Sequence, residues 1–236
     1  MSPDGRFIAV VVANGTASVR SDPKWSSKLG LLKLFAVRYV VLAEPQKLPG
    51  FHEVIGPVRA TGGHPGILYE ADTIPPYVRL MAGAVKAPND QIAPTASDPR
   101  FPVTQVALYP DSEPVSPVPI GSELPAPATA TATVASWEAG KMRIAIAGRD
   151  ERPLYLVVAE NWYKDWRATV NGKPVPLLRA QNTLLSVEVP PGTTEVGFEF
   201  RSPEYEKGRL ITLISLAIIA GLGVAAKVRG REPANA

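Results

Sequence analysis

The chain has 236 residues, 45% of them hydrophobic, and a formal net charge of +3, so its length suits one large or two small domains with an ordinary core. It contains no cysteine, which excludes disulfides, iron–sulfur clusters and thiolate zinc sites. The small charge and the lack of a basic stripe argue against nucleic acid as a partner. Its 25 prolines favour strands joined by extended loops.

The first part of the chain, residues 1–87, is expected to be a small α/β region. The apolar run Phe7–Ala13 is closed by an Asn-Gly turn and predicts a buried strand. Ser26 or Ser27 can cap a helix, because apolar residues follow them at helical spacing. This region therefore opens with a strand followed by a helix.

A strand at Val37–Leu42, stopped before Pro45, is predicted after that helix, and further extended segments follow at Ile67–Tyr69 and within residues 75–88. Residues 88–127 are rich in proline, so we expect no helix or central strand there. This segment is interpreted as an extended connector, or as a wrap over the surface of a partner.

Residues 128–203 show a different pattern, with short apolar strands at regular intervals and turn residues between them. Asn171–Gly172 between two strand-like runs is a strong hairpin signal, because both turn residues need a positive φ. The pattern predicts an antiparallel, jelly-roll-like β-sandwich, and a mainly β fold. Its strands are expected at Ala130–Trp137, Met142–Ala147, Leu154–Ala159, Arg167–Val170, Pro174–Leu178, Leu184–Val189 and Glu195–Phe200.

The last part of the chain contains an uncharged run, "LITLISLAIIAGLGVAA". We expect a single transmembrane helix over residues 210–228, with a juxtamembrane stretch at 204–209 and a tail at 229–236. The alternative is a buried helix of a soluble core. If the helix lies in a membrane, its small residues are suited to packing against a neighbouring helix; these are Ser215, Gly221 and Gly223.

Four pieces of the chain, in order, resemble the C-terminal end of YfhO-like bacterial membrane proteins, which are polytopic and glycosyltransferase-like. They are "LLKLFAVRYVVL", "LYLVVAENWYKDWRATVNGKPVPLLRAQN", "VEVPPGTTEVGFEF" and "RSPEYEKGRLITLISL". Lys164–Asp165 depart from the Pro-Gly that the family usually has before the tryptophan. The resemblance covers most of the chain but includes neither the family's other membrane helices nor its acidic catalytic loop.

The resemblance implies a place in the bacterial inner membrane, with residues 1–209 on the periplasmic side and the C-terminus in the cytoplasm. Lysine and arginine are balanced on the two sides of the apolar run and do not decide the orientation. The N-terminus is a poor signal peptide. We therefore expect the chain to be processed from a longer precursor or to start further upstream.

No catalytic constellation is recognisable, so the chain is not expected to be an enzyme, and no cofactor is expected. Both histidines, His52 and His64, lack an acidic cluster in the sequence around them, which argues against a metal site. Glu151, Glu160 and Asp165 are carboxylate candidates for glycoside chemistry only because aromatic residues are near.

The aromatic run "ENWYKDWRATVNGKPV" has two interpretations. Trp162 and Tyr163 can stack on a sugar ring while Asp165 and Gln181 bind hydroxyl groups, which makes these four residues candidate glycan or partner contacts. Alternatively, Trp166 packs in the sandwich core and Trp162 covers its edge. The second interpretation is favoured.

These observations predict a noncatalytic, membrane-anchored accessory or structural subunit that stabilises a larger membrane protein complex. Its partners would be other membrane protein subunits, the lipid bilayer and, as a candidate, a glycan. The alternative function is a carbohydrate-binding module of a cell-envelope glycosyltransferase.

Overall fold

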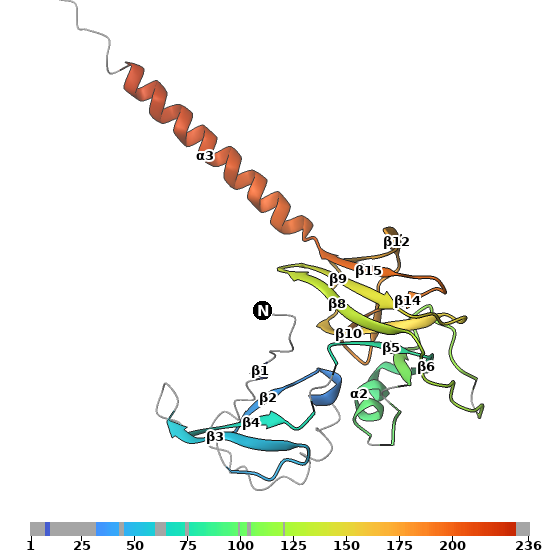
Figure 1. The fold of residues 1–236 in the computed structure, drawn as a ribbon. Helices are drawn as coiled ribbons and strands as arrows, with labels where there is room; N and C mark the ends of the chain where they lie inside the picture. Colours follow the sequence, from blue (N-terminus) through green and yellow to red (C-terminus); the bar gives the residue numbers. More distant parts are fainter. Residues whose placement is uncertain are drawn as a thin grey trace, which may run out of the picture. The chain divides into compact units, whose positions relative to one another are not determined.

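The computed structural model describes residues 8–9, 32–42, 45–59, 65–73, 76–98, 100–102, 105–119 and 121–229. The chain divides into two compact units, Met1–Glu199 and Phe200–Ala236. The first unit is mainly β, with several antiparallel sheets, and the second contains the helix α3, Pro203–Arg229 (Figure 1). The expected mainly β fold is therefore confirmed.

A five-stranded antiparallel sheet forms one layer of the first unit. Its buried and exposed residues alternate, most clearly along β9, as expected when one face packs on a core and the other meets solvent. The predicted turns are confirmed, with positive φ at Gly140, Asn171, Gly172 and Gly192. In spatial order the strands are β12 (Lys173–Val175), β11 (Trp166–Val170), β15 (Glu195–Phe200), β9 (Lys141–Ala147) and β8 (Thr131–Glu138).

A four-stranded sheet packs against it, and the two sheets share one core. That core includes Ile144 and Phe198 from the first sheet and Leu156 and Leu185 from the second, so the predicted sandwich is present. The second sheet consists of β13 (Leu178–Ala180), β14 (Leu184–Val189), β10 (Leu154–Asn161) and β5 (Val78–Met81), in that order. Strand β5 belongs to a stretch that precedes the predicted sandwich by about 50 residues of chain.

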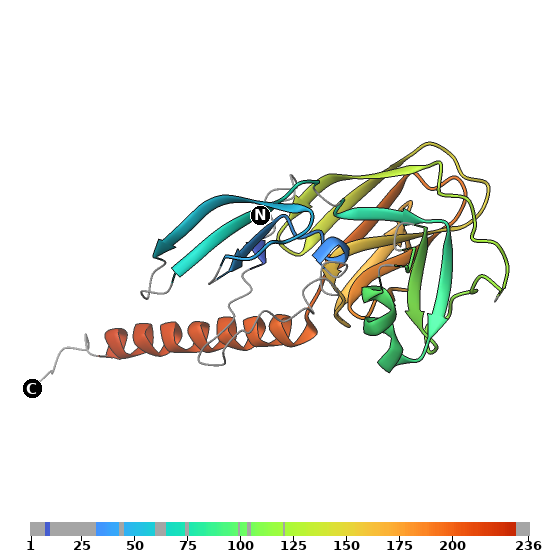
Figure 2. The same cartoon turned by 90° about the horizontal axis from the view of Figure 1, so that it is seen from below.

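The second sheet is covered on its other face as well. The strands β6 (Gly83–Ala87) and β7 (Val106–Pro110) form a parallel pair, and their Ala84 and Tyr109 pack with Tyr155 and Val157 of β10. This explains why every residue of β10 from Leu154 to Val158 is buried. Figure 2 shows the helix α2 (Asn89–Ser97) beside this pair, where Ile92 packs on Leu108.

These elements correct one expectation. Part of the proline-rich segment 88–127 is the helix α2, which contains Pro94, and another part is β7, whose five residues are all buried. Pro110 and Pro88 lie at positions that tolerate proline, because Pro110 ends its strand and Pro88 precedes the helix, whereas Pro94 lies within the helix.

The N-terminal strands form a separate four-stranded sheet with its own core, which includes Val40, Ile67 and Tyr69. The predicted strands at 37–42 and 67–69 are confirmed, whereas β3 was not predicted. Only Ile8–Ala9 of the first predicted strand and residues 32–36 of the predicted helix lie within the described residues; residues 32–34 are helical, whereas residues 35–36 form a turn. In spatial order the strands are β1 (Ile8–Ala9), β2 (Tyr39–Leu42), β4 (Pro65–Ala71) and β3 (Phe51–Arg59).

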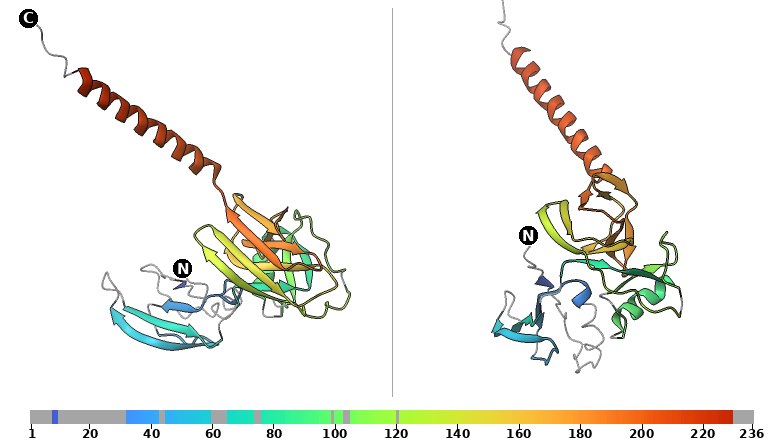
Figure 3. Two further views of the ribbon diagram at one scale, coloured as in Figure 1. Left: turned by 45° about the horizontal axis from the view of Figure 1, so that its top comes forward. Right: turned by 45° about the vertical axis from the view of Figure 1, so that its right-hand side comes forward.

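From Pro203 to Arg229 the second unit is one continuous helix, α3 (Figure 3). Its first two turns carry Glu204, Glu206, Lys207 and Arg209, so charge interrupts the apolar stretch at its start. The expectation that residues 210–228 cross a membrane is not confirmed, because among the described residues no helix combines the length and the apolar character that a crossing requires.

Candidate functional site

The aromatic run comprises the end of β10 and the strands β11 and β12, and its side chains range from buried to exposed. Trp162 and Trp166 are half-buried and pack against the sandwich core, which confirms the core interpretation of Trp166. Asp165, in the turn between the strands, is 6% exposed, and Tyr163 is 51% exposed. Of the predicted contact residues in this run, Tyr163 therefore presents the largest exposed surface.

Gln181 follows β13 with a positive φ of 49° and is 3% exposed. Its backbone N–H donates to Leu108 O at 2.7 Å, while its side-chain amide has no hydrogen-bond partner among the described residues. The guanidinium of Arg179 lies 6.0 Å from the ring centroid of Trp162 and donates to Asn89 Oδ1 at 3.0 Å. The guanidinium of Arg179 is thus a neighbour of the Trp162 ring. The glycan contact of Trp162, Tyr163, Asp165 and Gln181 stays a prediction.

The carboxylate candidates are not brought together with an acid–base partner. Glu160 accepts a hydrogen bond from the Tyr77 hydroxyl at 3.0 Å, and the exposed Glu151 lies in the loop before β10. Burial raises the pKa of Tyr77, and the nearby Glu160 carboxylate raises it further. This phenol is therefore a neutral donor that holds Glu160.

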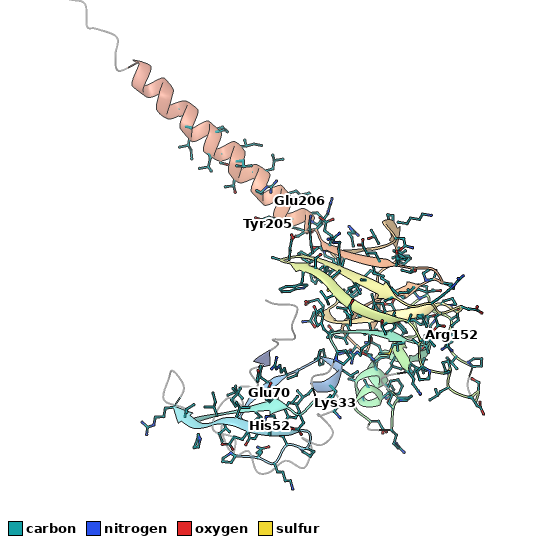
Figure 4. The ribbon with its side chains drawn as sticks, in the orientation of Figure 1. Lys33, His52, Glu70, Arg152, Tyr205 and Glu206 are labelled. Atoms are coloured by element: carbon teal, nitrogen blue, oxygen red, sulfur yellow. The ribbon has the colours of Figure 1, made fainter. Side chains whose placement is uncertain are left out.

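His52 pairs with Asp72 through Nδ1 and Oδ1 at 2.8 Å on the exposed surface of the N-terminal sheet (Figure 4). His64 lies outside the described residues. Across the described part of the chain, no group of three or more histidine, aspartate or glutamate side chains is placed to hold a metal ion.

A hollow of about 470 Å³ lies on the outer face of the five-stranded sheet and is called the groove below. Its centre is Gly197 of β15, the neighbour of Arg143 across the β9–β15 ladder. A Cβ atom built on Gly197 would lie 2.7 Å from Thr169 Oγ1. Glycine at this position therefore allows the close approach of the Thr169 side chain from the neighbouring strand.

Charged and hydroxyl side chains surround Gly197. Lys141 pairs with Glu199 at 3.2 Å, Arg143 reaches to 3.9 Å from Glu195, and Arg143 Nε donates to Ser136 Oγ at 3.0 Å. The rim also contains Glu138, Arg167 and Thr169. The sequence contained one signal for this site, the glycine inside the otherwise alternating strand "EVGFEF". No site was predicted from this glycine.

The helix α3 is the other distinctive surface. Large apolar side chains between positions 210 and 222 are 52–66% exposed: Leu210, Ile211, Leu213, Ile214, Leu216, Ile218, Ile219 and Leu222. Ser215 Oγ donates to Ile211 O at 2.9 Å and Thr212 Oγ1 to Gly208 O at 2.9 Å, which satisfies the two hydroxyls within the helix. A Cβ atom at Gly221 or Gly223 would meet nothing within 4 Å among the described residues, so their role in helix packing stays a prediction.

Most of the sandwich matches a known protein family. Residues 127–212 match the model of the bacterial membrane protein YfhO family. The match includes strands β8 to β15, the whole groove and the first turns of α3. This part of the chain is therefore similar to the YfhO family of bacterial membrane proteins. No curated protein and no solved structure matches the chain.

Proposed function

We propose that this protein is a noncatalytic accessory subunit of a larger bacterial membrane assembly, and that α3 is the element through which it attaches. The observation that carries the proposal is the exposure of eight large apolar side chains along α3. Leaving that much apolar surface in water is unfavourable by about 25 cal/mol per Å². The helix is therefore suited to apolar surroundings, such as the helices and lipid of a membrane complex.

The match to a membrane protein family supports the location of this subunit, and the β-rich first unit would lie on the extracytoplasmic side. The sandwich would then act physically, by covering part of the partner at the membrane surface. The lack of a catalytic constellation in the sequence fits a role in assembly.

Purification of the full chain from its native membrane in mild detergent, followed by crosslinking, tests this function. The wild-type chain should co-purify with at least one membrane protein. Ile214→Lys with Ile218→Lys should remove that partner, because each substitution would bury a charge in an apolar contact. Asp111→Lys, on an exposed turn of the first unit, is the matched control. A chain that purifies as a lone monomer, or a double variant that keeps its partner, contradicts the proposal.

The alternative function is a carbohydrate-binding module of a cell-envelope glycosyltransferase. The aromatic run gives it little support, because Trp162 is half-buried and Asp165 and Gln181 are buried. Of the four predicted contact residues, Tyr163 is the one whose side chain is largely exposed. Tyr163→Ala should abolish glycan retention if the run is the binding site and leave retention unchanged if it is not.

A further inference from the structure

We propose that the groove on the outer face of the five-stranded sheet binds an uncharged oligosaccharide. The inference does not depend on the accessory role, since it concerns a different surface of the YfhO-like part of the chain. The volume of the groove, about 470 Å³, lies within the range of about 300–1,000 Å³ that is usual for small-molecule sites. The lining residues come from four neighbouring strands, β8, β9, β15 and β11, and are held by a paired sheet.

The arrangement of the lining residues follows from strand register. Ser136 pairs with Arg143 and Arg143 with Gly197, while Glu138 pairs with Lys141 and Lys141 with Glu199. On the far side of β15, Thr169 lies against Gly197. Two rows of side chains thus cross the sheet, and one of them is interrupted by the glycine.

The charges on the rim balance, because three carboxylates, Glu138, Glu195 and Glu199, stand against three cations, Lys141, Arg143 and Arg167. A phosphate or nucleic acid would meet the carboxylates, and a polycation would meet the cations, so neither is favoured. Sugar hydroxyls both donate and accept hydrogen bonds. Carboxylates accept from them, guanidinium and ammonium groups donate to them, and the Ser136 and Thr169 hydroxyls do both.

An extended peptide fits this surface less well. Peptides that bind sheets usually add a strand at an edge and bond its main-chain groups. The groove lies on a sheet face, with β9 and β15 already paired to each other in a ladder of five residue pairs. A ligand in the groove can therefore form hydrogen bonds only with side chains. A saccharide is suited to this, because its hydroxyl groups point in several directions.

The test is calorimetric titration of the full chain with chitotetraose, cellotetraose and maltotetraose. We expect at least one of these to bind. Arg167→Ala and Glu138→Gln should each weaken that binding about tenfold or more, because each removes a hydrogen bond to a charged group. Both side chains are exposed, and within the described residues neither makes a side-chain hydrogen bond or ion pair. Folding should therefore be preserved, and far-ultraviolet circular dichroism checks this.

Lys173→Ala, on the neighbouring strand β12 and outside the groove, is the matched control and should bind as the wild type does. Three outcomes would overturn the proposal. They are no binding of any of the three sugars at millimolar concentration, equal loss in the control, and unchanged affinity in both groove variants. Failure of the membrane-partner experiment would leave this result standing, since the two experiments alter different units of the chain.

Discussion

At the scale of single residues, two buried hydroxyls link the layers of the first unit. Tyr109 of β7 and Ser186 of β14 are fully buried, their oxygens lie 2.6 Å apart, and Ser186 Oγ also donates to Leu156 O at 2.8 Å. Burial raises the pKa of Tyr109, although the hydrogen bond with Ser186 opposes this shift. The phenol is therefore neutral in the folded protein.

The first prediction concerns this pair. Ser186→Ala leaves the Tyr109 hydroxyl buried without a partner and should reduce the free energy of unfolding by about 1–3 kcal/mol. Tyr109→Phe should cost less, because Ser186 keeps its bond to Leu156. Urea denaturation measures both. If Tyr109→Phe lowers the free energy of unfolding as much as Ser186→Ala does, or more, then the Ser186 hydroxyl is not the group that stabilises the buried Tyr109 hydroxyl.

The second prediction follows from the raised pKa of Tyr109. The folded state keeps the proton, whereas the unfolded tyrosine ionises at about pH 10. The contribution to stability is therefore complete below that value and is lost as the pH rises above it. Wild-type protein should lose more stability above pH 10 than Tyr109→Phe does. Melting temperatures at pH 8 and above pH 10 measure this, and parallel losses in the two proteins would contradict it.

The third prediction concerns Asn171, which holds two turns together. Its Oδ1 accepts from Thr194 N at 2.9 Å and from Glu195 N at 3.1 Å, and its Nδ2 donates to Gly192 O at 3.4 Å. Its φ is 47°. Asn171→Ala should cost about 1–3 kcal/mol, because the bonds are lost and alanine is strained at positive φ. Asn171→Asp, which keeps the acceptor, is the control and should cost less in the same denaturation assay.

The sequence pattern predicted the hairpin at Asn171 but not the hydrogen bonds from the Asn171 side chain to the turn at 192–195. An Asn-Gly pair between apolar runs is a local signal, since its φ requirement lies within the two residues. The bonds from Asn171 to the turn at 192–195 join residues more than 20 positions apart, and no local pattern contains them. Gly197 is similar, because its importance depends on Thr169 across the sheet.

At the scale of elements, most strands of the sandwich could be predicted, while α2, β3, β7 and β13 could not; the single strand expected at Pro174–Leu178 is divided into β12 and β13. The strands predicted between residues 130 and 200 are short apolar runs, some of which alternate as β9 does, and turn residues with positive φ separate several of them. By contrast, Val106–Pro110 is a five-residue buried strand within a proline-rich stretch, and Asn89–Ser97 contains Pro94. Phe51–Arg59 contains a Gly-Pro pair that favours a turn. For β7 and α2 tertiary packing outweighed the local preference, whereas β3 is an exposed edge strand that forms by pairing with β4.

The fourth prediction concerns the stretch that follows the proline-rich segment. Arg152 donates to the carbonyls of Ala126 and Pro127, and Asp150 accepts from Thr129 N at 3.0 Å (Figure 4 labels Arg152). The backbone bond from Thr129 is the main cause that lowers the pKa of Asp150. Asp150 therefore contributes stability above its unfolded pKa of about 3.9, and this is lost as the pH falls through the lower folded value.

Asp150→Ala should release this stretch and speed hydrogen exchange at Thr129 at pH 7, because the N–H of Thr129 loses its acceptor. Mass spectrometry of peptic peptides covering 121–135 measures the exchange. Glu151→Ala, in the same loop but exposed, is the control. Equal protection in all three proteins would show that the anchor lies elsewhere.

At the scale of the whole molecule, the residues that match the family model are fewer than the residues that build the sandwich core. The match covers residues 127–212, but Val78 of β5 belongs to the sandwich core, and β5 pairs with β10 over four residues. On the other face of β10, the apolar cover includes Ala84 and Tyr109 from β6 and β7. The fold of the matched domain thus depends on chain that lies before it.

The last prediction compares two fragments, 128–202 and 76–202. The shorter fragment lacks β5, β6 and β7, so the β10 edge loses its partner strand, and Val157, Leu178 and Leu184 lose apolar cover. Burying large core side chains contributes about 1.5–3 kcal/mol each, and a domain is stable by only about 5–15 kcal/mol. We therefore expect 128–202 to be unfolded or aggregated and 76–202 to show dispersed amide signals in a ¹H–¹⁵N NMR spectrum. A well-dispersed spectrum from 128–202 alone would show that the matched region is self-sufficient and that β5 only adds an edge to it.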